Sequence, residues 1–346
     1  MSKNVVLCLD GTGNQVDARS STNVVRLFEL LDLSDAAAQV AYYDPGVGTF
    51  SAQGAWTGAG RAVSKLLGLA FGVGVRENLA EAYQFLMHHW EPGDRLFVFG
   101  FSRGAFAARA LAGLLHRAGV FRGGGENLVR YLVADYTGHR GDWADDDWKQ
   151  IDRMSAAFAH THRGSRSVPV EFLGLWDTVR AAGVLRRSMT WPYTRQLPNV
   201  GHAWHAVSID EKRRSYREYL IAATDRTVVN ETWFPGVHSD VGGTFDDDSR
   251  LATIALKWMV DGARGRGLLI REPAYRRQCA VDADDADGVL HRMGWVWGLL
   301  GYRRRTLPPG ARVHASLRKR TVPPAVRDRL PEDVVWEDGT WPAPPM

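Results

Sequence analysis

An α/β fold with a mainly parallel central sheet, covered by helices on both faces, is predicted for this chain of 346 residues. Short, continuous apolar runs, which are typical of strands buried on both faces, alternate with segments of helical periodicity. Turn residues such as glycine, proline and aspartate separate these segments. Hydrophobic residues make up 45% of the chain and charged residues 24%, so one large core can form and wholesale disorder is excluded. We therefore expect a single domain over residues 1–346.

Strands and helices are expected to alternate along most of the chain. The run 4–9 is apolar, contains β-branched residues and ends at Asp-Gly-Thr-Gly, which predicts a buried strand followed by a tight loop. The run 95–100 is the most strand-like in the sequence, and the alanine-, leucine- and arginine-rich run 105–118 is the most helix-like. Further strands are expected over residues 39–43, 168–176 and 227–234, and further helices over 23–33, 75–90 and 251–262.

Three segments depart from this alternation. Residues 121–167 are polar and irregular, and we interpret them as an inserted helical cap. The stretch that precedes the strand at 227–234 is polar and helix-like. Residues 322–346 are expected to form a C-terminal tail that wraps the surface.

Charge and cysteine content limit the partners and the compartment. The net charge of +4 and the pI near 9.1 are modest, and without a long basic run they argue against nucleic-acid binding. Cys8 and Cys279 are too few for a disulfide framework, and free thiols favour a cytoplasmic location. No apolar run is long enough for a signal-peptide core or a membrane span, although export by a non-classical route stays open. The sequence does not indicate the oligomeric state.

The pentapeptide Gly100-Phe101-Ser102-Arg103-Gly104 joins the most strand-like run to the most helix-like one. In this context the pattern G-x-S-x-G is typical of a nucleophile elbow, in which small flanking residues permit a sharp turn with the serine at its apex. The N-terminal end of the following helix adds positive potential that stabilises an oxyanion. These features predict an α/β-hydrolase fold with Ser102 as the nucleophile.

A nucleophilic serine needs a histidine to accept its proton and a carboxylate to fix the tautomer of that histidine. In this fold the chain order is serine, acid, histidine, and both partners lie on loops that follow later strands. Asp177 directly follows one predicted strand and His238 follows the next, so they are the predicted acid and base. Asp240 is the rival acid, and His205 and His314 are the reserve bases.

The oxyanion hole needs two backbone donors. The N–H of Arg103, directly after the nucleophile, is expected to be one, and Gly11 or Thr12 at the end of the first strand is expected to be the other. Asp10 is a candidate supporting residue, although residues 10–14 also fit a plain glycine turn. A phosphatase of the haloacid dehalogenase type is disfavoured, because Cys8 stands where that family has its nucleophilic aspartate.

No cofactor is expected, because an acyl-enzyme mechanism requires none. No metal site is expected either, since the acidic residues Asp240 and 246–248 fit a solvated loop better than a calcium site. Trp295 and Trp297, followed by Arg303 to Arg305, resemble a segment that rests on an anionic bilayer. Packing of these tryptophans in the core is the alternative.

Five motifs occur in the order found in one known family. They are Leu9-Asp10-Gly11-Thr12, Tyr43-Asp44-Pro45-Gly46-Val47-Gly48-Thr49, Gly100-Phe101-Ser102-Arg103-Gly104-Ala105, Leu175-Trp176-Asp177-Thr178-Val179 and Pro235-Gly236-Val237-His238-Ser239-Asp240-Val241-Gly242-Gly243. Together they resemble the uncharacterised α/β-hydrolase domain family that includes type VI secretion phospholipase effectors, over roughly residues 4 to 320. The stretch 205–214 is shared as well, and its plain interpretation is an ion-paired helix start.

The resemblance implies the same nucleophile, acid and base as the positional argument, and an ester of lipid or phospholipid type as the substrate. The sequence therefore predicts a serine hydrolase that cleaves carboxylic esters through an acyl-enzyme. Acyl transfer, with an alcohol or amine in place of water, is one alternative. A non-catalytic module that binds a membrane surface is the other. Acyl length and head group are not indicated.

Overall fold

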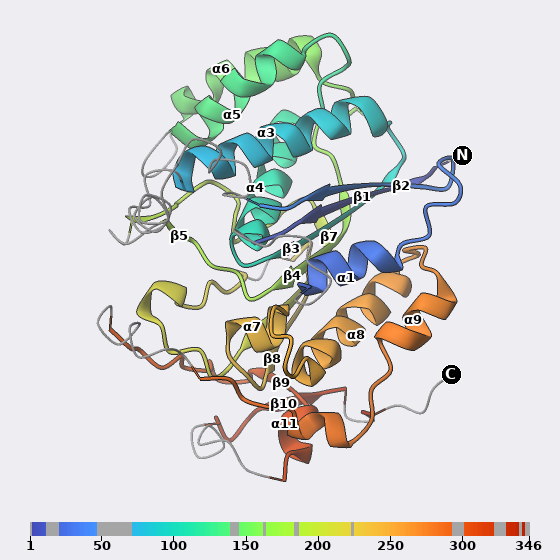
Figure 1. The fold of residues 1–346 in the computed structure, drawn as a ribbon. Coiled ribbons are helices and arrows are strands. Elements are labelled where there is room, and N and C mark those ends of the chain that lie inside the picture. Colours follow the sequence, from blue (N-terminus) through green and yellow to red (C-terminus); the bar gives the residue numbers. More distant parts are fainter. Residues whose placement is uncertain are drawn as a thin grey trace, which may run out of the picture.

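The computed structural model of the protein describes residues 2–11, 21–46, 71–138, 145–161, 164–182, 187–222, 225–292, 301–321, 330–338 and 341–342. Within them, an eight-stranded sheet has the strand order β10-β9-β8-β7-β4-β3-β1-β2, each strand parallel to its neighbours (Figure 1). The strands are β1 (Asn4–Leu9), β2 (Gln39–Asp44), β3 (Arg95–Phe101), β4 (Val170–Trp176), β7 (Val200–Ser208), β8 (Val228–Phe234), β9 (Arg312–His314) and β10 (Val335–Glu337). A separate antiparallel pair consists of β5 (Ala181–Ala182) and β6 (Arg187–Ser188).

Helices cover both faces of this sheet, which confirms the predicted α/β class (Figure 1). On one face lie α3 (Phe71–His89) and α4 (Arg103–Ala118), with α5 (Val129–Gly138) and α6 (Asp145–Phe158) packed outside them. On the other face lie α1 (Asn23–Leu30) and α8 (Arg250–Arg264), with α9 (Glu272–Gln278) beside them. The shorter helices are η1 (Glu126–Leu128), η2 (Arg214–Tyr216), α7 (His238–Gly242), η3 (Asp284–Asp287) and α11 (Ser316–Lys319).

Strand β1 lies inside the sheet, between β2 and β3, and all of its residues are buried. Val5 and Leu7 belong to the apolar core under α3 and α4, whereas Val6 and Cys8 belong to the core under α1 and α8. Because both faces of the strand are covered, its sequence is continuously apolar and does not alternate with polar residues.

The predicted cap and the predicted tail both contain regular structure. Residues 121–167 include α5 and α6, which form an outer layer over α3 and α4. Within residues 322–346, β10 pairs with β9 and extends the sheet at its edge. Trp341 is buried against the core on the α8 side. This part of the tail therefore contributes to the sheet and to the core.

The prediction of a helix-like stretch before the strand at 227–234 is wrong at its centre, because residues 200–208 form β7 in the middle of the sheet. Strand β7 pairs with β4 on one side and with β8 on the other. His205 lies directly opposite Glu231 of β8, and the imidazole Nδ1 is 2.8 Å from the Glu231 carboxylate. His202, His205 and Ser208 interrupt the apolar run of this strand, and the buried His205 is tolerated because it has a cross-strand partner.

Neither cysteine of the chain is in a disulfide, and both are buried. Burial raises the pKa of the Cys279 thiol to about 12 and that of the Cys8 thiol further still. Neither is therefore a nucleophilic thiolate at neutral pH.

In the described residues, no helix combines the length and the apolar character that crossing a membrane requires.

Candidate active site

The predicted site residues lie at the carboxyl ends of neighbouring strands. Phe101 of β3 is paired with Trp176 of β4, so Ser102 and Asp177 directly follow two adjacent strands. Strands β7 and β8 end beside them, and His238 begins the short helix α7 that follows β8. Because parallel strands end at the same edge of a sheet, residues far apart in the sequence meet here.

Ser102 forms a sharp turn between β3 and α4. Its φ of 58° and ψ of −117° lie outside the regions that L-residues favour, as in a nucleophile elbow. The backbone is held there because the Ser102 N–H donates to the Trp176 carbonyl at 3.0 Å, and the Ser102 carbonyl accepts from the Val179 N–H at 3.1 Å. The side chain is buried, and its hydroxyl forms no hydrogen bond within the described part of the chain.

The two glycines of the elbow are required by close approach of the backbone. A Cβ on Gly104 would lie 2.1 Å from the Leu9 carbonyl oxygen, and one on Gly100 would lie 2.5 Å from the Gly104 carbonyl oxygen. Both distances are shorter than van der Waals contact, and the obstacles are backbone atoms that cannot move aside. The G-x-S-x-G pattern thus follows from the packing of Gly104 against the end of β1 and of Gly100 against the start of α4.

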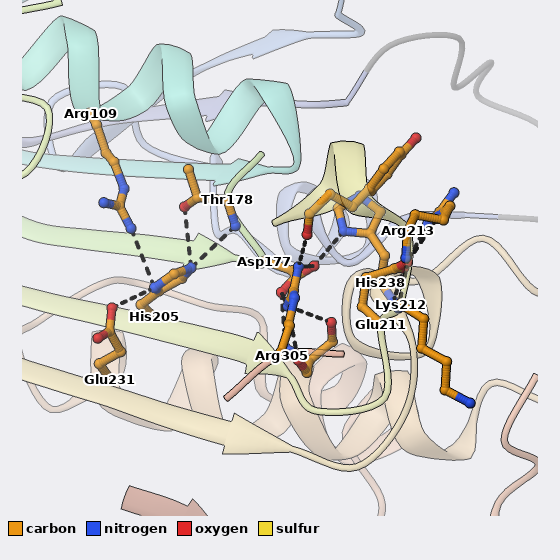
Figure 2. Close-up of polar contacts among 12 residues, drawn as sticks. Arg109, Asp177, Thr178, His205, Glu211, Lys212, Arg213, Glu231, His238 and Arg305 are labelled. Atoms are coloured by element: carbon orange, nitrogen blue, oxygen red, sulfur yellow. Dashed lines mark hydrogen bonds and ion pairs between the residues drawn. The ribbon is translucent and has the colours of Figure 1, made fainter. Parts of the chain in front are cut away.

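The Asp177 carboxylate is fully buried and has several donors (Figure 2). Oδ2 accepts from His238 Nδ1 at 2.6 Å and from Arg305 Nη2 at 3.0 Å. Oδ1 accepts from the Ser208 N–H at 2.9 Å and from Arg305 Nη1. Burial alone would raise the pKa of Asp177, but the Arg305 charge and the His238 hydrogen bond outweigh it and hold the pKa well below its usual range. The acid is therefore ionised at neutral pH.

The His238 imidazole is fixed by one hydrogen bond and two aromatic contacts. Its ring stacks on Phe101 at a centroid distance of 4.6 Å and meets the edge of Tyr216 at 4.9 Å. Burial lowers the pKa of His238, although the Asp177 carboxylate acts in the opposite direction. With Nδ1 donating to Asp177, the neutral ring has Nε2 as its acceptor. The histidine is thus in the protonation state that a general base needs.

The stretch 205–214 now has a structural role, and the predicted ion-paired helix start is found at its end, where the Glu211–Arg213 pair directly precedes η2, which begins at Arg214. Its first residues end β7, and the next form a loop against the start of α7. Glu211 Oε2 accepts from Arg213 Nη2 at 2.8 Å and from the His238 N–H at 3.3 Å. Asp210 Oδ2 accepts from the Gly236 N–H at 2.9 Å. The ion pair therefore also positions the backbone that carries His238.

Arg305 is the main site residue that the sequence does not reveal. The expectation that it belongs with Arg303 and Arg304 to a membrane-facing segment is wrong for Arg305, which is only 4% exposed. Arg303 and Arg304 are exposed as expected. Nothing in the local sequence distinguishes the three arginines, because the partner of Arg305 is Asp177, 128 residues earlier. Trp295 and Trp297 lie outside the described residues.

His205 belongs to a separate cluster (Figure 2). Its Nε2 accepts from the Thr178 N–H at 3.2 Å, and its Nδ1 faces Glu231. Burial lowers its pKa, so the ring is neutral, with Nδ1–H donating to Glu231. Arg109 Nη2, 3.3 Å from Nδ1, then faces a second donor. Through the hydrogen bond to the Thr178 N–H, the cluster fixes the loop that directly follows Asp177.

Asp240 and His314, the rival acid and the second reserve base, also have different partners. Asp240 accepts from the Val237 N–H at 2.9 Å and contacts His291 Nδ1, so it does not orient His238. His314 lies on β9, stacks on Phe234 and contacts the Ser316 hydroxyl. In this structure, Asp177 alone of the two candidate acids hydrogen-bonds to the His238 imidazole.

The expected oxyanion donors are placed only in part. Arg103 begins α4, so its N–H is among the first-turn donors of that helix. The Gly11 N–H donates to Asp10 Oδ1 at 2.6 Å, and Thr12 lies outside the described residues. Asp10 Oδ2 accepts from the Thr22 hydroxyl at 2.6 Å, which ties the end of β1 to the start of α1. A cavity of about 10 Å³ beside Asp10 and Arg103 is large enough for a single water.

The described residues contain no group of three or more histidine, cysteine or acidic side chains that could hold a metal ion.

Comparison with known proteins decides the family. The family described as "T6SS, Phospholipase effector Tle1-like, catalytic domain" matches residues 3–262. The chain belongs to this family. Membership confirms the resemblance and supports lipid-ester hydrolysis at the level of the family. The chain is also 34% identical over 220 residues to "Uncharacterized protein YEL023C" of Saccharomyces cerevisiae (strain ATCC 204508 / S288c), which covers 62% of this Tle1-like chain and 32% of the yeast protein.

Two solved structures are similar to this chain at 20% sequence identity. One is the "Crystal structure of an uncharacterized protein from Pseudomonas aeruginosa", with a TM-score of 0.45, covering 82% of this chain and 49% of that one. The other is the "Structure of the Tle1 effector bound to the VgrG spike from the Type 6 secretion system", with a TM-score of 0.40, covering 70% and 51%. The chain thus spans about a third of the yeast relative and about half of each solved chain.

Proposed function

We propose that this protein is a serine hydrolase that cleaves carboxylic esters of lipids, with Ser102 as nucleophile, His238 as general base and Asp177 as the acid that orients the base. The hydrogen bond from His238 Nδ1 to Asp177 Oδ2, at 2.6 Å, carries the proposal. It leaves Nε2 as the proton acceptor at the edge of the sheet where Ser102 forms its strained turn. Family membership supports the lipid ester as substrate.

In the proposed mechanism, His238 Nε2 accepts the Ser102 proton while Oγ attacks the ester carbonyl carbon. The oxyanion is stabilised by the N–H groups at the start of α4, beginning with Arg103. The imidazolium then protonates the leaving alcohol, and a water molecule, activated by the same histidine, cleaves the acyl-enzyme. The hydrogen bond between Ser102 and His238 forms as substrate orders the site, because catalytic contacts often tighten only in the complex.

A basic rim next to His238 supports an anionic lipid surface as the place of contact. The rim consists of Lys212, Arg214, Arg303 and Arg304, all exposed, with half-exposed Tyr302 among them. Its two segments are joined, because the Arg303 N–H donates to the Lys212 carbonyl at 2.7 Å and the Arg214 N–H donates to the Gly301 carbonyl at 3.2 Å. In the part of the chain that is described, none of the four cations has a carboxylate partner. Exposed cations beside an aromatic ring are typical of contact with anionic head groups.

Buried, unpaired Cys8 and Cys279 support a reducing compartment, and thus the cytoplasmic location expected from the sequence.

The test combines a fluorophosphonate probe with turnover of p-nitrophenyl butyrate and of phosphatidylglycerol vesicles. Ser102→Ala is expected to remove labelling and to lower turnover by at least about 10³-fold, with unchanged circular dichroism. Ser155→Ala is the matched control, because Ser155 is also buried but bonds to the Ala118 carbonyl on α4. Turnover retained by Ser102→Ala would refute the proposal. A wild-type protein that is not labelled would favour the non-catalytic binding module.

The membrane part of the proposal is tested separately by vesicle sedimentation. Wild-type protein is expected to bind phosphatidylglycerol vesicles more strongly than phosphatidylcholine vesicles, and Arg303→Gln/Arg304→Gln is expected to lose most of this difference. Equal binding of the variant and the wild type to anionic vesicles would contradict the role of the rim.

A further inference from the structure

The guanidinium of Arg305 binds the Asp177 carboxylate and three further acceptors beside it. Nη1 and Nη2 donate to Oδ1 and Oδ2 of Asp177, which makes the pair bidentate. Nη1 also donates to the carbonyl and the hydroxyl of Ser208, both at 2.8 Å, and Nη2 to the Tyr216 carbonyl. Arg305 therefore connects the loop after β4, the end of β7 and the loop that contacts His238. Both terminal amino groups of this buried guanidinium are hydrogen-bonded, which offsets much of the cost of removing the charge from water.

Among the described residues, charges act on the His238 ring from several elements, and they include two ion pairs. Glu211 and Arg213, from the loop after β7, bind each other at 2.8 Å, so their effects on the imidazole largely offset. Tyr216 presents the edge of a neutral ring. The remaining pair is Asp177 and Arg305. A carboxylate paired with a guanidinium stabilises an imidazolium less than an unpaired carboxylate does, because the guanidinium contributes the opposite potential at the ring.

We propose that Arg305 is a positioning residue of this site, which fixes the Asp177 carboxylate and keeps the His238 imidazole available as a base to lower pH. This inference rests on the proposed serine-hydrolase function. Arg305 lies beyond residues 3–262, which the family description matches, so a segment from the C-terminal part of the chain takes part in the candidate site. Its backbone is held there by the contacts of Gly301 and Arg303 with the loop at 212–214.

The test compares wild type with Arg305→Met, Arg305→Lys and a control, Arg320→Met. Arg320 is also buried in the C-terminal part of the chain, but it donates to the carbonyls of Ala286 and Gly288 and has no hydrogen bond or ion pair with Asp177. The first measurement is kcat/KM for p-nitrophenyl butyrate as a function of pH. The second is the titration of the His238 ring by NMR in a Ser102→Ala background, which does not depend on turnover.

In Arg305→Met, the acid limb of the pH profile and the His238 titration are expected to move up by about one to two pH units. This is the effect of one elementary charge within about 8 Å at an effective dielectric of about 20. kcat is expected to fall by about tenfold to hundredfold with little change in KM, because the acid loses its fixed orientation. Arg305→Lys keeps the charge and is expected to keep the acid limb while losing part of kcat. Arg320→Met is expected to match wild type in both.

An acid limb and a His238 titration in Arg305→Met that coincide with wild type would overturn the inference. If Arg305→Met does not fold, Arg305→Lys decides, and wild-type kcat in that variant would overturn the positioning role. Failure of the proposed function is seen separately, as absence of fluorophosphonate labelling in the wild type. In that case the NMR titration still reports whether Arg305 controls the imidazole.

Discussion

Replacing Glu211 with glutamine is expected to destabilise the protein strongly, although the two side chains have nearly the same shape. The Glu211 side chain is fully buried and accepts from the Lys212 and Arg213 N–H groups, from Nε and Nη2 of Arg213, and from the His238 N–H. A glutamine replaces one acceptor oxygen with a donor and removes the carboxylate that forms the 2.8 Å ion pair with the Arg213 cation, which is 9% exposed. Loss of one partner of a buried pair costs about 3–5 kcal/mol.

The matched control is Glu218→Gln, in the same region of the chain. Glu218 faces Arg217 at 3.9 Å, and the arginine side chain is 57% exposed, so this pair contributes about 0–1 kcal/mol. Both variants are compared with wild type by urea denaturation at pH 7, monitored by tryptophan fluorescence. A free energy of unfolding for Glu211→Gln within about 1 kcal/mol of that for Glu218→Gln would refute the reasoning. The fluorophosphonate labelling rate is expected to fall in Glu211→Gln alone.

Two further predictions concern the surroundings of α7. Although burial opposes it, the Asp240 and Asp247 carboxylates raise the pKa of His291. The protonated His291 ring therefore stabilises the folded protein fully below the unfolded pKa near 6.5, and this contribution is lost as pH rises through the folded pKa. His291→Gln should therefore lower the free energy of unfolding more at pH 6 than at pH 9 in parallel urea titrations, and an equal effect at both would contradict this. Gly242→Ala places a Cβ 1.9 Å from the Phe101 ring, on which His238 stacks. We therefore expect the free energy of unfolding to fall by about 1–3 kcal/mol and fluorophosphonate labelling to become slower. Unchanged labelling would show that the ring need not move.

The parts of the fold that the sequence predicts are those determined by neighbours along the chain. Strand β1, strand β3 and helix α4 lie where the apolar run at 4–9, the strand-like run at 95–100 and the alanine-rich run at 105–118 predict them. The elbow is recognisable because the turn at Ser102 requires glycines on either side of it. Asp177 and His238 follow from the rule that parallel strands end at one edge, and their roles in catalysis stay predictions.

The parts that the sequence does not reveal depend on partners far along the chain. Strand β7 does not show a continuous apolar run, because it contains a buried histidine, His205, that is paired with Glu231 on the next strand. The sequence does not distinguish Glu211 from the charged residues on either side of it, and only the structure shows its contact with the His238 backbone. Arg305 follows two other arginines, and only the fold shows that Arg305 is buried while Arg303 and Arg304 are exposed. A local pattern cannot report such contacts.

The distance along the chain between Asp177 and Arg305 has a consequence for how the protein is made. A ribosome has synthesised the acid 128 residues before it reaches the arginine, and the strands on either side of the acid are complete well before then. During that interval the carboxylate has the Ser208 N–H and His238 as hydrogen-bond partners, but it lacks the cation that compensates its burial. We expect the nascent chain to leave this edge of the sheet open until the arginine emerges, so that closure of the site is a late event in biosynthesis.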